Sequence, residues 1–463
     1  MTDSDARVAA YLQQAAQQAW NVEGISDDLP RRKVERVGII GAGTMGGGIS
    51  MNFASAGLPV TIVETKQDAL DRGLTTIRKN YQRSADRGRF PQEEVDICMN
   101  CYTPSLDLSA LANCDLIIEA VFEDMEIKKS VFSQLDKIAK PGAILATNTS
   151  ALNIDEIAAV TSRAQDVIGL HFFSPANVMR LLEIVRAEKT ADDVVATSVD
   201  LARHIGKVAT LVGVCPGFVG NRILFARQYQ ANALIYEGIM PWDIDAAFNE
   251  FGFKMGPFQM ADLAGLDIGW KKGATTTNPI RDALCELDRR GQKTGAGYYD
   301  YDENRRNVPS DVTAGIIREI TGAGDASMSS DAIIDRCVIP MINEALAILA
   351  ENKAQRPSDI DVVWINGYGW PLDKGGVMYY ADLIGADKVL AVMKELAAKD
   401  ESIRASVLPV LSESLNLCSS TKPREFHFIE IQFMRFVVYT YPNLPLIGQL
   451  ARYVEPHFIR YRC

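Results

Sequence analysis

Residues 37–64 read VGIIGAGTMGGGISMNFASAGLPVTIVE, and this stretch decides the fold. A short β-branched run (37–40) precedes a GxGxxG motif (41–46), and a helical stretch (45–56) leads to a second β-branched run that ends in Glu64. A strand, a glycine-rich turn, a helix and an acid-ended strand at this spacing are typical of dinucleotide-binding βαβ units. The sequence therefore predicts an α/β domain of the Rossmann type.

The motif residues have separate physical roles. Gly41 permits the tight turn, Gly43 lets the backbone approach a pyrophosphate, and Gly46 allows the helix and strand to pack closely. The N–H groups at the helix start, where Thr44 and Met45 stand, then bind phosphate oxygens. We therefore expect these five residues to contact a dinucleotide.

Glu64 decides between cofactors. Its carboxylate can accept hydrogen bonds from the adenine ribose hydroxyls and would repel a 2′-phosphate, so the sequence favours NAD over NADP. FAD proteins share the glycine fingerprint and are the main rival. A purely structural glycine turn is the remaining alternative.

Composition and charge argue against several classes of protein. The chain has 463 residues and a formal net charge of -11, which argues against a nucleic-acid binder because such proteins need a basic face. No apolar run reaches the roughly 18 residues of a membrane span, and the N-terminus has no apolar signal-peptide core. Cys98 and Cys101 form one CxxC without a second pair, so we expect reduced thiols and no metal site.

Five segments are expected along the chain. Residues 1–35 read as a helix and a linker, and residues 36–215 alternate strands and helices around a mostly parallel sheet. Residues 216–320 and 331–417 read as two related all-α domains, because 232–248 resembles 344–364 and 251–267 resembles 368–387. Residues 418–463 form a basic, aromatic tail. It is either a partner- or membrane-surface segment, a docked terminus, or a stretch without selected function.

His171 is the candidate general base. It ends the apolar run 166–170, and ligands of a doubly wound sheet bind beyond the carboxyl ends of strands. Histidine suits removal of a hydroxyl proton near neutral pH. Glu183, inside the apolar run 181–185, is the candidate partner that orients the imidazole. A structural histidine and a solvent-facing glutamate on an edge strand are the alternatives.

Six ordered motifs carry a family resemblance, and they run from about residue 36 to about residue 400. They are GAGTMGGGI, IIEAVFEDMEIKK, NTSALNIDEIA, GLHFFSPANVMRLLEIV, CPGFVGNRI and GFKMGPFQMADLAGLD. Together they resemble the 3-hydroxyacyl-CoA dehydrogenases of fatty-acid β-oxidation. HFFSP with GYGWP is most similar to the dehydrogenase half of the peroxisomal-type bifunctional enzymes.

The resemblance implies roles for matching residues. His171 would be the base and Glu183 its partner, while Ser150 and Asn221 would hold the reacting part of the substrate. The residues implied at the cofactor are Asn148, Glu123, Lys128 and, with a weaker match, Lys293.

Two substrate contacts are less specific. Many relatives have Asn where Ser174 stands, whereas the peroxisomal-like branch has Ser, so we expect activity to be retained with Ser174 as a substrate contact. Arg87, with Arg78, Lys79 and Arg83, falls on or beside the helix after Glu64 and would meet the CoA phosphates. A solvated helix face is the alternative for this basic group.

The expected activity is NAD-dependent oxidation of (S)-3-hydroxyacyl-CoA to 3-oxoacyl-CoA. The rivals are a dehydrogenase of free small 3-hydroxy acids and a non-catalytic NAD-binding relative. The duplicated helical part suggests a monomer, and the N-terminal helix suggests association with, or derivation from, a hydratase-containing chain. The terminal Arg-Tyr-Arg-Cys is not a Ser-Lys-Leu signal, so we expect a cytoplasmic location, with the peroxisomal matrix as alternative.

Overall fold

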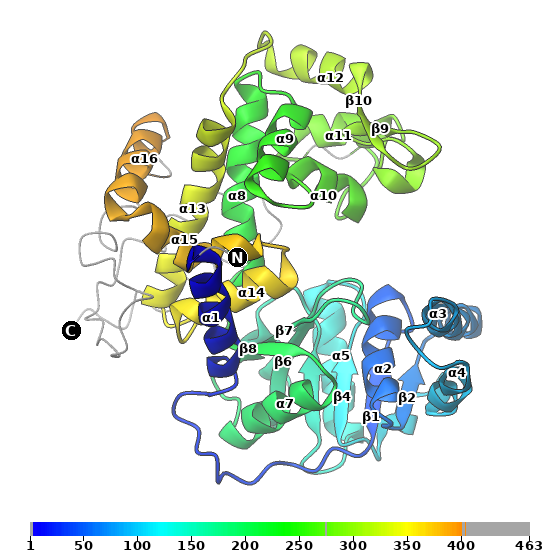
Figure 1. Ribbon diagram of the computed structural model, residues 1–463. Coiled ribbons are helices and arrows are strands. Elements are labelled where there is room, and N and C mark those ends of the chain that lie inside the picture. Colours follow the sequence, from blue (N-terminus) through cyan, green and yellow to red (C-terminus); the bar gives the residue numbers. More distant parts are fainter. Residues whose placement is uncertain (1–2, 274–275, 401–402, 404–463) are drawn as a thin grey trace, which may run out of the picture. The chain divides into compact units, whose positions relative to one another are not determined.

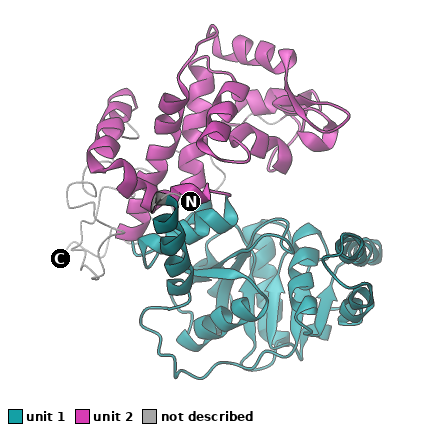
Figure 2. Cartoon of the chain, viewed as in Figure 1, with its two compact units in different colours: residues 1–221, 351–368 teal, residues 222–350, 369–463 magenta. Residues whose placement is uncertain are grey.

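The computed structural model describes residues 3–273, 276–400 and 403. The chain forms two compact units (Figures 1 and 2). Unit 1 comprises residues 1–221 and 351–368, and unit 2 comprises residues 222–350 and 369–463. Unit 1 is therefore assembled from two stretches of sequence that are far apart in the chain.

A single large sheet forms the centre of unit 1. Its strands lie in the order β3-β2-β1-β4-β5-β6-β7-β8, the succession expected for a doubly wound dinucleotide-binding sheet with two further strands at one edge. All neighbouring pairs are parallel except β6 and β7. The strands are β1 (Val37–Ile40), β2 (Val60–Val63), β3 (Tyr102–Ser105), β4 (Leu116–Glu119), β5 (Ile144–Thr147), β6 (Val167–Phe172), β7 (Leu181–Arg186) and β8 (Val208–Gly213). The prediction of a mostly parallel sheet is confirmed.

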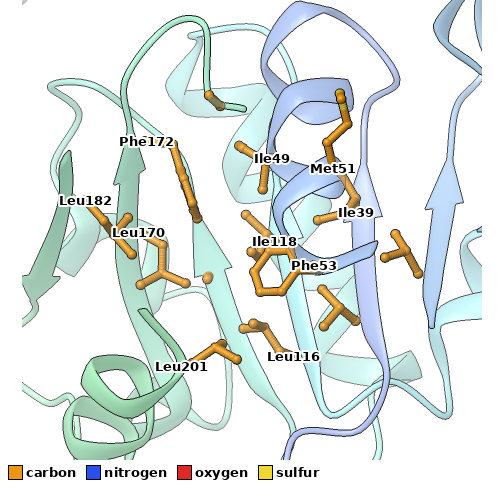
Figure 3. Packing of buried hydrophobic residues seen from close by; sticks show 14 of the residues in the cluster. Ile39, Ile49, Met51, Phe53, Leu116, Ile118, Leu170, Phe172, Leu182 and Leu201 are labelled. Atoms are coloured by element: carbon orange, nitrogen blue, oxygen red, sulfur yellow. The ribbon is translucent and has the colours of Figure 1, made fainter. Parts of the chain in front are cut away.

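Helices pack on the sheet because consecutive strand residues point to opposite faces and nearly all of them are buried, most of them apolar. Phe53 of α2 lies beside Ile118 of β4 (Figure 3) and meets the ring of Phe172 edge-on, with 6.5 Å between the ring centroids. The helices of this part are α2 (Thr44–Ser55), α3 (Gln67–Asp86), α4 (Gln92–Met99), α5 (Met125–Ile138), α6 (Ile154–Ala158) and α7 (Asp192–His204), with short turns η1 (Leu108–Leu111) and η2 (Ala164–Asp166). Burial of apolar residues between the helices and the sheet stabilises unit 1 and fixes the positions of the strand ends, where the candidate site residues stand.

The N-terminal helix is part of unit 1 rather than a separate piece. Ala15 of α1 (Asp3–Gln18) and Ala19, which follows the helix, are buried with Val362 of α14 (Pro357–Gly367). The Tyr11 hydroxyl donates to Asp361 Oδ2 at 2.6 Å. The helical spacing of apolar residues in α1 therefore reflects a face that packs on α14.

Unit 2 is mostly helical. It contains most of α8 (Gly220–Tyr236), then α9 (Pro241–Phe251), α10 (Pro257–Ala264), α11 (Pro279–Glu286), α12 (Asp311–Thr321), α13 (Ser330–Ala350), α15 (Val377–Ile384) and α16 (Ala386–Lys399). The short elements are β9 (Tyr299–Tyr301), β10 (Asn307–Pro309), η3 (Gln292–Thr294) and η4 (Leu372–Lys374). The succession α8, α9, α10 is repeated by α13, α14, α15, and both middle helices begin with a proline at their first turn.

The compact units and the expected segments divide the chain differently. The first unit continues to residue 221, beyond the boundary expected near 215, and it takes α14 out of the expected 331–417 segment. The five-segment division therefore stays a prediction. The whole of the tail, 418–463, lies outside the described residues, and in the described part of the chain no helix is long and apolar enough to cross a membrane.

Candidate active site

The glycine-rich turn has the geometry that its sequence predicts. Gly41 has a φ of +101°, and a Cβ there would lie 2.7 Å from the Ala120 carbonyl oxygen. A Cβ at Gly46 would lie 1.9 Å from the Gly41 carbonyl oxygen, so only glycine fits between turn and helix. At Gly43 an added Cβ would meet nothing within 4 Å. The turn is thus closed on its protein side and open at Gly43.

Helix α2 begins at Thr44 and has Gly43 as its N-cap, which offers no side chain to the first N–H groups. Unpaired N–H groups at a helix start are suited to an anion. Thr44 is exposed and Met45 is half-buried. This is the arrangement in which a phosphate oxygen supplies the missing acceptors.

Glu64 stands directly beside the turn. One carboxylate oxygen, Oε2, accepts a hydrogen bond from the Ala42 N–H at 3.1 Å, and the other accepts from the Thr65 N–H at 2.7 Å. The side chain is half-buried at the end of β2. Its carboxylate is therefore fixed next to the motif, as a ribose-binding acid requires.

His171 and Glu183 form a buried pair. They are opposite each other in the antiparallel register of β6 and β7, and His171 Nδ1 lies 2.7 Å from Glu183 Oε2. Glu183 is fully buried, and its second oxygen accepts the Gly220 N–H at 2.9 Å. Glu183 therefore does not face solvent, and β7 lies between β6 and β8 rather than at an edge.

The rings around His171 restrict it further. The Phe173 ring centroid is 4.3 Å from that of the imidazole, and the Phe218 ring centroid is 5.7 Å away. Phe218 adopts a φ of +50°, which a non-glycine residue seldom does. The CPGFVG turn thus holds an aromatic ring against the histidine.

Asn221 and Ser150 meet beside this pair. Asn221 Nδ2 donates to the Ser150 carbonyl oxygen at 3.2 Å, and Ser150 Oγ donates to Glu123 at 3.0 Å. Asn148 Oδ1 accepts the N–H of Phe172, the neighbour of His171 in β6, at 2.8 Å. The loop after β5 therefore links the histidine strand to Asn221 and Glu123.

Glu123 and Lys128 belong to one charged network. Lys128, 1% exposed, lies 2.8 Å from Glu119 and 3.3 Å from Glu123. Glu123 also accepts from the Ser150 N–H at 2.8 Å. Desolvation opposes ionisation of Glu123, but Lys128 and the hydrogen bonds hold the pKa of Glu123 below its ordinary value. The network keeps an ionised carboxylate beside Ser150.

Three predicted residues are not brought into this cluster by any contact. Ser174 is exposed in the loop after β6, and Arg87 is exposed just beyond α3. Lys293 belongs to unit 2, where its ammonium pairs with Asp267. Their roles stay predictions.

The sequence analysis missed three buried residues of the site. Glu119 ends the apolar strand β4, and a charge in such a run is the same signal that identified Glu183. Tyr368 donates from its hydroxyl to Asn221 Oδ1 at 2.8 Å, and only its place in GYGWP had attracted attention. Lys207 lies before β8 and carries no motif. Tyr368 and Lys207 each contact a segment that lies well away from them in the chain, and local sequence patterns do not indicate such contacts.

Lys207 holds the loop that follows the histidine strand. Its Nζ donates to the carbonyl oxygens of Ala176 and Met179, both at 2.7 Å, and the residue is 6% exposed. Asn52 of α2 donates to the same Ala176 oxygen at 3.1 Å. Burial lowers the pKa of Lys207 to about 8. A buried ammonium thus ties the 174–180 loop to the sheet.

The two cysteines of the CxxC motif lie in unit 1. Cys98 is buried, Cys101 is half-buried, and both are free thiols. Burial raises the pKa of each thiol. Across residues 3–273, 276–400 and 403, no group of three or more His, Cys, Asp or Glu side chains is placed to hold a metal ion.

Comparison with known families matches most of the chain. Residues 36–215 match the family described as 3-hydroxyacyl-CoA dehydrogenase, NAD binding domain. Residues 217–301 and 333–421 match 3-hydroxyacyl-CoA dehydrogenase, C-terminal domain. The first of these domains is of the type that binds an NAD-type dinucleotide.

Individual relatives agree. The chain is 42% identical over 399 residues to the peroxisomal bifunctional enzyme of Cavia porcellus, covering 80% of this chain and 54% of that one. It is 41% identical over 399 residues to the enzyme of the same name from Homo sapiens, with 80% and 55% covered. The chain therefore spans about half the length of the curated relatives that it matches.

Solved structures share the fold over nearly their whole length. The 3-hydroxybutyryl-CoA dehydrogenase of Escherichia coli K12 superposes with a TM-score of 0.70 and 27% identity, covering 82% of this chain and 98% of that one. The dehydrogenase part of multifunctional enzyme 1 from C. elegans superposes with a TM-score of 0.61 and 30% identity. The match covers 87% of this chain and 96% of that one. With both of its domains matched, the chain belongs to the 3-hydroxyacyl-CoA dehydrogenase family.

Proposed function

We propose that this protein oxidises (S)-3-hydroxyacyl-CoA to 3-oxoacyl-CoA, with NAD as the hydride acceptor, as a step of fatty-acid β-oxidation. The observation that carries the proposal is the buried His171–Glu183 pair at the carboxyl end of β6. It lies in the same unit as the glycine-rich turn. Family membership supports the choice of an acyl-CoA substrate.

The pair is suited to general base catalysis. A buried carboxylate at Nδ1 favours the tautomer with its proton on that nitrogen, which leaves Nε2 with a lone pair. Nε2 can then accept the proton of a 3-hydroxyl group as the carbonyl forms. Glu183 stabilises the resulting imidazolium, and the Gly220 N–H keeps the carboxylate in place.

The turn residues and Glu64 fit a bound NAD. Gly43 leaves its space open, and the Thr44 end of α2 offers N–H groups to a pyrophosphate. We propose that Gly41, Gly43, Thr44, Met45 and Gly46 hold the pyrophosphate and that Glu64 binds the adenine ribose and disfavours NADP. The bound cofactor supplies the hydride acceptor. Glu123, Lys128 and Asn148 are proposed for its nicotinamide side, and Lys293 for a further contact.

Ser150 and Asn221 are proposed to hold the oxygen of the reacting carbon. Both belong to unit 1 with His171, and they are already joined by the 3.2 Å hydrogen bond from Asn221. Ser174 and Arg87 are proposed to contact substrate farther from the reacting carbon, because both are exposed and available. The assignments of Ser150 and Asn221 follow the family pattern, and that of Arg87 follows from its basic surroundings beside α3.

A turnover assay tests the proposal. Purified protein is given NAD and 3-hydroxybutyryl-CoA or longer homologues, and NADH formation is followed by absorbance, with NADP as a parallel arm. We expect turnover with the CoA esters and a preference for NAD. Turnover of free 3-hydroxybutyrate but not of its CoA ester would favour the free-acid dehydrogenase. Tight NAD binding without turnover at any chain length would favour the non-catalytic relative.

Partners and location are also proposals. We propose that the protein works beside an enoyl-CoA hydratase activity and is a monomer, which light scattering coupled to size-exclusion chromatography measures. The peroxisomal names of its relatives now favour the peroxisomal matrix over the cytoplasm. Fractionation of cells that express the native chain decides between the two locations.

A further inference from the structure

Tyr368 ties the second helical copy to the site. It follows α14 directly, is 8% exposed, and donates its hydroxyl hydrogen to Asn221 Oδ1 at 2.8 Å. Asn221 is one of the residues proposed to hold the reacting group. Tyr368, from the second helical copy, therefore contacts Asn221, which stands near the beginning of the first helical segment (216–320).

The hydrogen bond fixes the orientation of an amide. An asparagine presents an acceptor on one side and two donor hydrogens on the other, and these exchange places if the amide turns over. Tyr368 occupies Oδ1, and the Ser150 carbonyl accepts one Nδ2 hydrogen at 3.2 Å. In this orientation the second Nδ2 hydrogen can donate to a substrate oxygen. Without the tyrosine hydroxyl, the reversed amide would offer an acceptor instead.

Close packing holds the tyrosine in position. A Cβ at Gly220 would lie 2.5 Å from the Tyr368 ring and hydroxyl, and a Cβ at Gly367 would lie 2.4 Å from Leu181. The ring stacks on Trp364, with 4.5 Å between centroids. Only glycine at both places lets the end of α14 approach the start of α8 and of β7 this closely.

The aromatic contacts reach the histidine. Phe173 packs edge-on against Tyr368, with 5.4 Å between ring centroids, and the same Phe173 ring is 4.3 Å from His171. Ring packing alone, however, does not require the hydroxyl group. The role of the hydroxyl must therefore be sought in its hydrogen bond.

The internal repeat offers a comparison within the chain. Phe251-Gly252-Phe253 in the first copy corresponds to Tyr368-Gly369-Trp370 in the second. Phe251 packs only through its ring, for example edge-on against Tyr380 at 5.2 Å. The position thus tolerates an aromatic ring without a hydroxyl in one copy. A buried hydroxyl costs free energy unless it is hydrogen-bonded, and at 368 Asn221 provides the acceptor.

We propose that Tyr368 is a positioning residue for the reaction, which keeps the Asn221 amide turned with its N–H toward the substrate oxygen. This inference rests on the proposed function for its effect on turnover. Tyr368 does not touch substrate in this assignment and acts only through Asn221. The second helical copy thereby contributes to substrate recognition as well as to the fold.

The test is Tyr368→Phe, which keeps the ring and removes the hydroxyl. We expect kcat to fall about 3- to 10-fold, the worth of one neutral hydrogen bond, with an unchanged KM for NAD. Affinity for acetoacetyl-CoA, measured by calorimetry without turnover, should fall by a similar factor. Tyr229→Phe is the matched control, because that hydroxyl donates to Asp400 at 2.7 Å in unit 2. It should alter the melting temperature only.

A double-mutant cycle tests whether Tyr368 acts through Asn221. In an Asn221→Ala background, Tyr368→Phe should have no further effect on kcat or on acetoacetyl-CoA affinity. Wild-type kcat and affinity in Tyr368→Phe would overturn the proposal, as would equal effects in both backgrounds. If the wild type binds acetoacetyl-CoA but never turns over, the proposed function fails, and the affinity arm of the cycle still decides the role of Tyr368.

Discussion

His171 and Glu183 are direct cross-strand neighbours, with 2.7 Å between Nδ1 and Oε2. They are neighbours across the antiparallel pair of the sheet, where β7, and with it the parallel strand β8, runs opposite to β6. Opposite residues of an antiparallel pair lie close enough for their side chains to touch. The change of strand direction between β6 and β7 therefore brings the proposed base and its carboxylate partner together on rigid elements.

Replacing the base should abolish most of the turnover. His171→Gln is expected to lower kcat by about 10²- to 10⁴-fold, the usual worth of a general base, while NAD affinity stays at the wild-type value. Steady-state kinetics and NAD titration measure the two quantities. His204→Gln, at the end of α7, is the control and should leave kcat unchanged. A His171→Gln variant with wild-type kcat would assign the proton transfer to another residue.

The partner carboxylate should matter almost as much. In Glu183→Gln, the neutral amide can still accept the Gly220 N–H but cannot stabilise an imidazolium. We expect kcat to fall at least about 10²-fold with little change in the KM for NAD. The exposed Glu188 gives the control Glu188→Gln, which should behave as wild type. Full activity in Glu183→Gln would reduce its role to packing.

The two glycines of the turn should respond differently to alanine. A Cβ at position 46 meets the Gly41 oxygen at 1.9 Å, so Gly46→Ala is expected to lower the melting temperature and to abolish NAD binding. Gly43 has an ordinary φ of -70° and open space around it, so Gly43→Ala should melt as wild type does. Its methyl group would nevertheless fill the space of the pyrophosphate, and NAD affinity should fall at least about 10-fold. Wild-type NAD affinity in Gly43→Ala would contradict this placement.

Glu64 should set the cofactor preference. Glu64→Ser removes the carboxylate and is expected to weaken NAD binding about 10- to 100-fold, the worth of hydrogen bonds to a charged group. The ratio of kcat/KM for NADP to that for NAD should rise, because repulsion of a 2′-phosphate is removed. Kinetics with both cofactors measure the ratio, and Glu93→Gln on α4 is the exposed control. An unchanged ratio would mean that another residue selects the cofactor.

Lys207 should make stability depend on alkaline pH. Its pKa is about 8 in the folded chain and 10.5 as a free side chain, so between these values the unfolded chain holds a proton that the folded chain has lost. The unfolding free energy of the wild type should therefore rise with pH over this window relative to Lys207→Met, by at most about 3 kcal/mol. Denaturant melts of both proteins from pH 7 to pH 10 measure the difference. A constant difference across that range would show that the ammonium is not destabilised by burial.

Local sequence patterns predicted the parts of the site that lie within one element or one turn. Residue spacing and hydrophobicity are sufficient to predict the glycine motif, Glu64 and the strand that ends near His171. Strand β8 also has a clear apolar pattern within the segment predicted to alternate strands and helices. Strand β3 could not be recognised, because it is an exposed edge strand that contains Pro104.

Contacts between distant segments could not be predicted in the same way. His171 lies opposite Glu183 because of the direction and register of β7. Neither can be predicted from the residue pattern of the strand. Tyr368 reaches Asn221 because α14 packs with β7 and β8 in unit 1, although the helical repeat had assigned it to a separate domain. Periodicity reports which face of an element is buried, but not which distant partner covers it.

The discontinuity of unit 1 has a consequence for biosynthesis. A ribosome that has translated residue 221 has made every strand of the sheet, but α14 is still to be made. At about 5–20 residues per second, the nascent chain waits on the order of ten seconds before Tyr368 emerges. During that interval the faces of α1 and β8 that α14 will cover are exposed to other chains and to chaperones. The proposed base and its carboxylate partner are thus synthesised well before Tyr368, which completes unit 1.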